Sequence, residues 1–160
     1  MKLLSGINNY LIDQSGKAWG DLLSGWDEIL PGEFTLWMVN RFGDLILVLA
    51  DGSVQFLDVG IGQLSHIADS REHFFDVVDQ GGNVSNGLMI ESVDQCVDAG
   101  MHLKSDQCYS YRIPPILGGS YIVDNFEPAD LSVHYTFLAD IWRQTKDVPD
   151  GTKVHTVVTD

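Results

Sequence analysis

Three consecutive β-rich segments constrain the fold more than any other feature of this sequence. They cover residues 34–42, 44–50 and 53–59 and are rich in the aliphatic and aromatic residues that favour strands. Asp51-Gly52, between the last two, is a dipeptide that two-residue hairpin turns prefer. In the middle segment, residues 45–50 (LILVLA) are apolar at successive positions, so this strand should be central or covered on both faces. The sequence therefore predicts an antiparallel meander.

Helical patterns and shorter strands surround this meander. A short helix is predicted in the second half of residues 8–23, capped by Ser15. Ser70 is expected to cap a second helix that Gly81-Gly82-Asn83 ends, and a third helix spans 88–99. Asp130 is expected to cap the longest helix, over 131–146. Brief strands are predicted at 64–67 and 109–113, and residues 154–158 form either an edge strand or a disordered tail.

These elements predict one α+β domain over residues 1–160. Its sheet is expected to be largely antiparallel and built on the central meander, with helices packed mainly on one face. A length of 160 residues and a hydrophobic fraction of 44% fit a single core. Strand order and oligomeric state are left open.

The strongly negative net charge of the chain indicates which kinds of partner it can bind. A formal net charge of −14 repels phosphates, so direct binding of nucleic acid is not expected. The acid excess either keeps the protein soluble or attracts a basic partner, and composition does not choose between the two. We find no 18-residue uncharged apolar run that would span a membrane, and no secretion signal. Cys96 and Cys108 have no zinc-site spacing and are expected to be reduced, buried thiols of a cytoplasmic protein.

Motifs for chemistry are missing from the sequence. There is no Gly-x-Ser-x-Gly nucleophile motif, and the five histidines are scattered one per element. No 12-residue stretch has the oxygen-ligand pattern of a calcium loop, and Gly118-Gly119 lacks the Lys-Ser/Thr end of a phosphate loop. We therefore predict no catalytic residues, no metal and no cofactor, and a protein that is not an enzyme.

The densest block of unusual residues covers 107–144. It combines aromatic residues, paired prolines, paired glycines and the longest predicted helix. Aromatic anchors within a charged rim are typical of interaction surfaces. A second interpretation is a pocket for a small molecule or peptide, formed by Tyr109, Tyr111, Tyr121 and His134. The candidate binding residues are Tyr109, Tyr111, Tyr121, His134 and Trp142.

Several spaced motifs carry a resemblance to one bacterial family. They lie at 40–45, 52–60, 68–71, 107–121, Asn125, 133–144 and 149–152. With these motifs the chain resembles the family defined by the C-terminal domain of type VI secretion DNase-immunity proteins. It departs from the family pattern at 140–142, where Trp142 stands in place of a histidine. The resemblance implies a non-catalytic cytoplasmic protein that docks on a co-produced nuclease toxin, a basic protein, and neutralises it.

Overall fold

The structure is a computed structural model that describes residues 6–79 and 87–148. Two predicted features lie outside the described residues. They are the helix end at Gly81-Gly82-Asn83 and the turn and tail from residue 149 onward.

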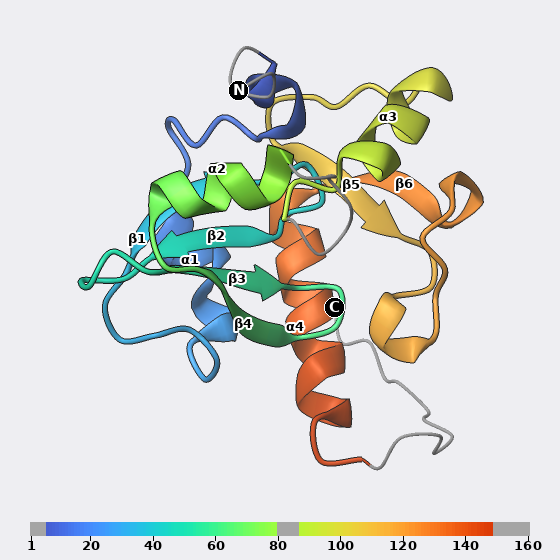
Figure 1. Ribbon diagram of the computed structural model, residues 1–160. Coiled ribbons are helices and arrows are strands. Elements are labelled where there is room, and N and C mark those ends of the chain that lie inside the picture. The colour runs from blue at the N-terminus through green and yellow to red at the C-terminus, as the bar shows by residue number, and fades with distance from the viewer. Residues whose placement is uncertain (1–5, 80–86, 149–160) are drawn as a thin grey trace.

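A four-stranded antiparallel meander forms the main sheet (Figure 1). Its strands are β1 (Thr35–Val39), β2 (Leu45–Val48), β3 (Val54–Asp58) and β4 (Gln63–Ala68), paired in chain order. The α+β class and the meander are thus confirmed. The β2–β3 connection differs from the prediction, because three residues separate Leu49 from its hydrogen-bonded partner Ser53. The Asp51 carboxylate accepts both the backbone N–H and the hydroxyl of Ser53, which favours this longer turn.

Both faces of the sheet are covered. On one face, the side chains of Leu45, Leu47 and Leu57 pack against α1 (Trp19–Leu22) and α4 (Leu131–Thr145). On the other face, Ile46 and Phe56 pack against α2 (Arg71–Asp79) (Figure 1). The helices therefore divide between the two faces instead of gathering mainly on one. The cause lies in β2, whose four residues are all buried and all apolar, so that each face of the sheet needs a cover.

The helix ends follow the sequence in part. The Ser70 hydroxyl accepts the His73 N–H at 3.1 Å, as expected for the cap of α2. α1 has only four residues, and Ser15 does not cap it. The helix is short because Gly16, at φ 72°, has a left-handed backbone that interrupts helical geometry. The side chain of Asp130 makes no capping bond to α4, and the carbonyl of Asp106 accepts the Leu131 N–H instead.

A second sheet of two antiparallel strands lies beside the meander. It pairs β5 (Gln107–Tyr111) with β6 (Phe126–Asp130), and α3 (Ile90–Asp98) packs near them (Figure 1). β6 was not expected from the sequence, because its residues, FEPAD, are mostly polar and include Pro128. Proline is tolerated in an edge strand, where its missing N–H breaks no ladder bond. β5 joins the turn after β1 through a 2.7 Å bond from the Tyr109 N–H to the Arg41 carbonyl.

Candidate partner-binding face

A single asparagine closes the loop that connects β5 to β6. The side-chain oxygen of Asn125 accepts the Ile113 N–H at 2.9 Å, and its Nδ2 donates to the carbonyls of Ile113 and Ser120, each at 2.9 Å. Its own carbonyl accepts the Arg112 N–H at 2.8 Å. Because one buried side chain bridges both ends and the middle, residues 112–125 form a closed and cross-linked loop.

Two glycines allow the loop to turn back on itself. Gly118 follows the short 3-10 helix Pro115–Leu117 and adopts φ 92°, a left-handed backbone that favours glycine. A Cβ atom on Gly119 would lie 1.7 Å from the Ile113 carbonyl oxygen, so the chain passes too close for any side chain there. Gly118 is therefore required by its left-handed backbone conformation, and Gly119 by the close approach of the Ile113 carbonyl.

The loop holds two apolar side chains in solvent. Ile113 is 56% exposed and Ile122 is 53% exposed, and both are among the four exposed large apolar residues in the described part of the chain. The loop rests on the turn after β3, where the Ile116 N–H donates to the Gly60 carbonyl at 3.0 Å. Trp142 covers the same turn, since a Cβ atom on Gly62 would lie 2.1 Å from its ring. We call residues 59–62, residues 112–125 and Trp142 the loop face.

The five sequence-predicted residues lie within and beneath this face. Tyr109, Tyr111 and His134 are buried, whereas Tyr121 and Trp142 are half-buried. The Tyr111 ring contacts the Tyr121 ring at 5.9 Å and the His134 ring at 6.4 Å between centroids. Trp142 instead contacts Trp26, at 6.2 Å. The structure thus brings three of the five together and places Trp142 apart from them, and a binding role for each stays a prediction.

His134 is a buried, neutral histidine with both ring nitrogens bonded. Its Nε2 lies 2.8 Å from the Phe42 carbonyl and its Nδ1 lies 2.7 Å from the Ser110 hydroxyl. A carbonyl only accepts, so Nε2–H donates to Phe42 and Nδ1 accepts the Ser110 hydroxyl proton. The pKa of His134 is lowered to about 4, because the lowering by burial outweighs the rise that the hydrogen bond to the Phe42 carbonyl would cause. The ring ties α4 to the β1–β2 turn.

The lowered pKa of His134 predicts a specific loss of stability in acid. The folded ring protonates near pH 4 and an unfolded histidine near 6.5, so its contribution is complete above pH 6.5 and falls as the pH drops toward 4. The free energy of unfolding of the wild type should exceed that of His134→Gln by about 3 kcal/mol less at pH 4 than at pH 6.5. Urea unfolding of both proteins at each pH measures the difference. A constant difference would contradict the assignment.

Asp44 and Asp58 also make stability depend on pH, in the direction opposite to His134. Both carboxyl groups are present in the wild type and in His134→Gln, so their contributions cancel when the two proteins are compared. Burial raises the pKa of both carboxyl groups, and in Asp44 the nearby Asp58 raises it further. Raised carboxyl pKa values favour the folded state as the pH falls, which is opposite to the effect of His134. The carboxylate of Asp44 accepts the Val59 N–H at 3.0 Å and the side-chain amide of Asn40 at 2.9 Å.

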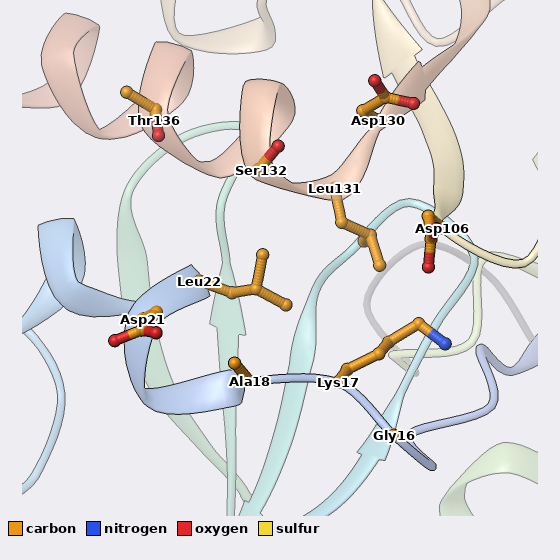
Figure 2. A pocket seen from close by; sticks show the side chains of 10 residues that line it. All are labelled: Gly16, Lys17, Ala18, Asp21, Leu22, Asp106, Asp130, Leu131, Ser132 and Thr136. Carbon is orange, nitrogen blue, oxygen red and sulfur yellow. The ribbon is translucent and has the colours of Figure 1, made fainter.

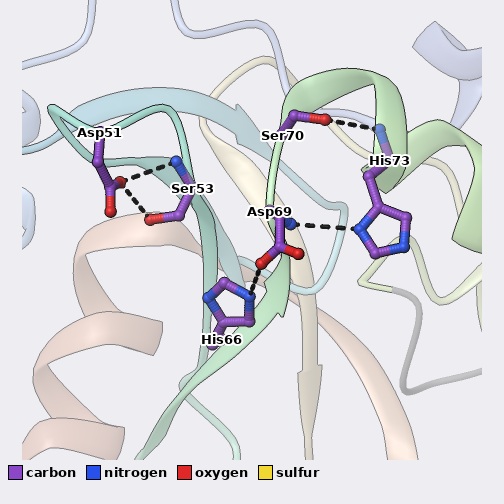
Figure 3. A network of polar contacts seen from close by, with 6 residues as sticks. All are labelled: Asp51, Ser53, His66, Asp69, Ser70 and His73. Atoms are coloured by element: carbon purple, nitrogen blue, oxygen red, sulfur yellow. Dashed lines mark hydrogen bonds and ion pairs between the residues drawn. The ribbon is translucent and has the colours of Figure 1, made fainter.

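Two surface histidines form a separate polar network beside α2 (Figure 3). His66 Nε2 lies 2.9 Å from an Asp69 carboxylate oxygen, and the Asp69 N–H donates to His73 Nδ1 at 3.3 Å. The described residues contain no group of three metal-ligating side chains. With the Ser70 cap, these bonds account for the entry into α2, and they supply no nucleophile paired with a base.

Both cysteines are free and buried, as predicted. Burial raises the pKa of the Cys96 thiol to about 12. The pKa of the Cys108 thiol is also raised, mainly by burial and to a smaller extent by the negative charges of Asp44 and Asp130. Both thiols are thus protonated at neutral pH and unreactive.

The comparisons bear on the segment that carries most of the loop face. Residues 68–142 match the family model of the T6SS immunity protein Tdi1, C-terminal. This segment of the chain is therefore similar to the C-terminal domain of a type VI secretion immunity protein. The predicted resemblance is confirmed over this segment, which is just under half of the chain. Within the Tdi1-type segment lie loop 112–125, Trp142 and the other four predicted residues, whereas the 59–62 turn precedes it.

Other comparisons add little to the Tdi1 match. No curated protein matches the chain. The crystal structure of Atu4351 from Agrobacterium tumefaciens is 17% identical, with a TM-score of 0.47. That alignment covers 75% of this chain and 60% of Atu4351, so the chain spans less than two thirds of its length. No helix in the described residues is long and apolar enough to cross a membrane.

The sequence marked Asn125 only as a position of the family motif and did not reveal how Asn125, Ile113 and Ile122 shape the loop face. Asn125 holds the loop closed, and Ile113 and Ile122 are its exposed apolar groups. An isoleucine inside a strand-like sequence reads as a core residue, so no local signal distinguishes an exposed one. The Asn125 bonds join residues that are five and twelve positions apart, which a periodicity pattern does not reveal.

Proposed function

We propose that this chain is an immunity protein that docks on a toxin and neutralises it without catalysis. The observation that carries the proposal is the match of residues 68–142 to the Tdi1 immunity family. We take residues 1–160 as one immunity-type domain acting in the cytoplasm, where a co-produced toxin would meet it.

The loop face is the surface that we assign to the toxin. Ile113 and Ile122 provide apolar area that a partner can bury, and Asn125 holds their loop in one conformation before binding. A pre-ordered loop loses little entropy on binding, which favours affinity. Tyr121 and Trp142, both half-buried, would add aromatic contacts at the same face. In this proposal Tyr109, Tyr111 and His134 support the face from the core.

The proposed toxin is a basic nuclease. A net charge of −14 would attract a protein with a basic nucleic-acid-binding cleft and accelerate its association. A stable blocking interface would bury on the order of 1,600 Å². That area exceeds what the two isoleucines supply, so exposed acids around the loop face, such as Asp124, would form a charged rim.

Co-expression with the product of the adjacent open reading frame tests the proposal. The chain should form a complex with that protein and restore growth to cells that it otherwise arrests. A purified complex should also lose nuclease activity in proportion to the immunity protein added. Growth arrest that the chain does not relieve, or a neighbouring product that does not bind, would contradict the immunity role.

A charge placed on the loop face should weaken this binding. We expect Ile113→Glu and Ile122→Glu each to weaken the complex by about tenfold or more, because a carboxylate would be desolvated at the interface. Melting temperatures should stay near that of the wild type, since both side chains are exposed. Val97→Glu is the matched control, because Val97 is 44% exposed on α3, outside the loop face. Equal losses for all three variants would contradict the assignment.

A further inference from the structure

Most basic side chains in the described residues have a defined electrostatic partner. Arg112 and Lys146 pair with glutamates at 3.6 and 2.7 Å, and Arg143 pairs with Asp140. The guanidinium of Arg71 lies 5.7 Å from the centre of the Trp37 ring. Within residues 6–79 and 87–148, the three that remain have neither an ion pair nor a ring contact of this kind: Lys17, Arg41 and Lys104.

These three side chains line the same cavity. It has a volume of about 300 Å³ and lies between residues 11–17 and 103–107, with Arg41 contributed by the β1–β2 turn. Three segments that are distant in sequence thus converge on it. A neighbouring cavity of about 470 Å³ shares Lys17 and Asp106 with it and extends between α1 and the start of α4 (Figure 2). The two cavities are therefore adjacent, and the larger one is lined by the further carboxylates Asp21 and Asp130, which do not line the smaller one.

The three basic side chains donate few hydrogen bonds to other groups of the protein. Lys17 donates to the Asp13 carbonyl at 2.6 Å, and Arg41 Nη2 donates to the Asn8 carbonyl at 3.3 Å. The Arg41 Nε is buried without a hydrogen-bond acceptor, and its charge works against the rise that burial gives to the Tyr109 pKa. Both of these acceptors are neutral carbonyls. Hydrogen bonds from Ser15 and, to a smaller extent, the Lys17 charge lower the pKa of Asp13, whereas neither Arg41 nor Lys104 forms an ion pair within the described residues.

Two carboxylates also line the cavity, and they do not cancel its charge. The Asp13 carboxylate accepts the Ser15 N–H at 2.9 Å, and Asp106 is exposed at the rim. Three cations and two carboxylates leave a positive excess in the lining, on a chain whose net charge is −14. A local reversal of sign in a cleft concentrates ligands of the opposite charge.

We propose that this cavity binds a small organic anion through carboxylate or phosphate oxygens held by Lys17, Arg41 and Lys104. Guanidinium and ammonium groups are the usual protein donors to both kinds of oxygen. The site is separate from the loop face, because the two share no residue. It therefore stands whether or not the chain neutralises a toxin.

Titration of the full chain with citrate and with pyrophosphate tests the site. Each is added while backbone amide shifts are followed by NMR, with sodium chloride at equal ionic strength as the reference. We expect at least one probe to bind with a dissociation constant below about 1 mM and to shift amides of residues 11–17 and 103–107. Binding of citrate alone indicates a carboxylate ligand, and binding of pyrophosphate alone indicates a phosphate ligand. Failure of both to bind would overturn the proposal.

Charge-matched variants separate a site from general attraction. Lys104→Gln and Lys17→Gln should each weaken binding by about tenfold, the value of one charge-assisted hydrogen bond. Lys146→Gln carries the same charge change outside the cavity, beside Glu28, and should leave the affinity unchanged. Equal weakening by all three variants would overturn the proposal. Unchanged thermal unfolding would show that the two cavity variants remain folded.

Discussion

Replacing Asn40 with alanine is expected to destabilise the fold by about 4 kcal/mol, the largest effect that we predict. The Asn40 side chain uses its full bonding capacity within the core. Its oxygen accepts the N–H groups of Phe42 and Asp44 at 2.9 and 3.0 Å. Its amide donates to the Asp44 carboxylate at 2.9 Å and to the Gly87 carbonyl at 2.8 Å. Alanine would leave several buried polar groups without partners, and each costs about 1–3 kcal/mol.

Urea unfolding of Asn40→Ala and of the wild type at pH 7 gives this difference directly. Asn9→Ala is the matched control, because Asn9 is exposed and the same atoms are removed. The control should change the free energy of unfolding by no more than about 0.5 kcal/mol. A loss below about 1 kcal/mol for Asn40→Ala would mean that the turn holds its shape without this side chain.

Replacing Gly119 with alanine is expected to cost about 3 kcal/mol and to displace the loop face. The new Cβ atom would lie 1.7 Å from the carbonyl oxygen and 2.6 Å from the carbonyl carbon of Ile113. These are backbone atoms, which a change of side-chain rotamer does not move. The loop must therefore shift as a whole, which breaks the Asn125 bonds and moves Ile113.

Gly20→Ala is the control for Gly119→Ala. A Cβ atom on Gly20 meets no atom within 4 Å, and its backbone is helical, so the substitution should be neutral or slightly stabilising. Melting temperature and toxin binding are measured together for both variants. If Gly119→Ala retains both, the chain at this crossing is looser than the contact distance implies.

The meander could be predicted from the sequence because the patterns that specify its strands and turns involve residues close together in the chain. Alternation and apolar runs in 34–59 specify strands, and the Asp51 turn joins neighbours in the chain. The helical periodicity located α2, α3 and α4 to within about two residues, although of these three helices only α2 has its predicted side-chain cap. It missed β6, since an edge strand that contains Pro128 owes its pairing to β5, a partner distant in the sequence.

The candidate site shows the same division. Aromatic residues were selected because their size and amphipathic character mark interfaces, yet size equally favours a core, and Tyr109 and Tyr111 are buried. Which aromatic side chain faces solvent depends on the elements that cover it. No residue-level pattern contains that information.

An acidic α+β chain with an antiparallel meander, buried thiols and a resemblance to the Tdi1 family over residues 68–142 can be recognised from the amino-acid sequence. These properties follow from composition, local propensity and motif order. The folded chain, in contrast, was needed to see that helices cover both faces of the sheet and that Asn125 closes a loop exposing Ile113 and Ile122. It also brought Lys17, Arg41 and Lys104 to one cavity. Such features arise from contacts between segments far apart in the chain, which packing selects and local preference does not encode.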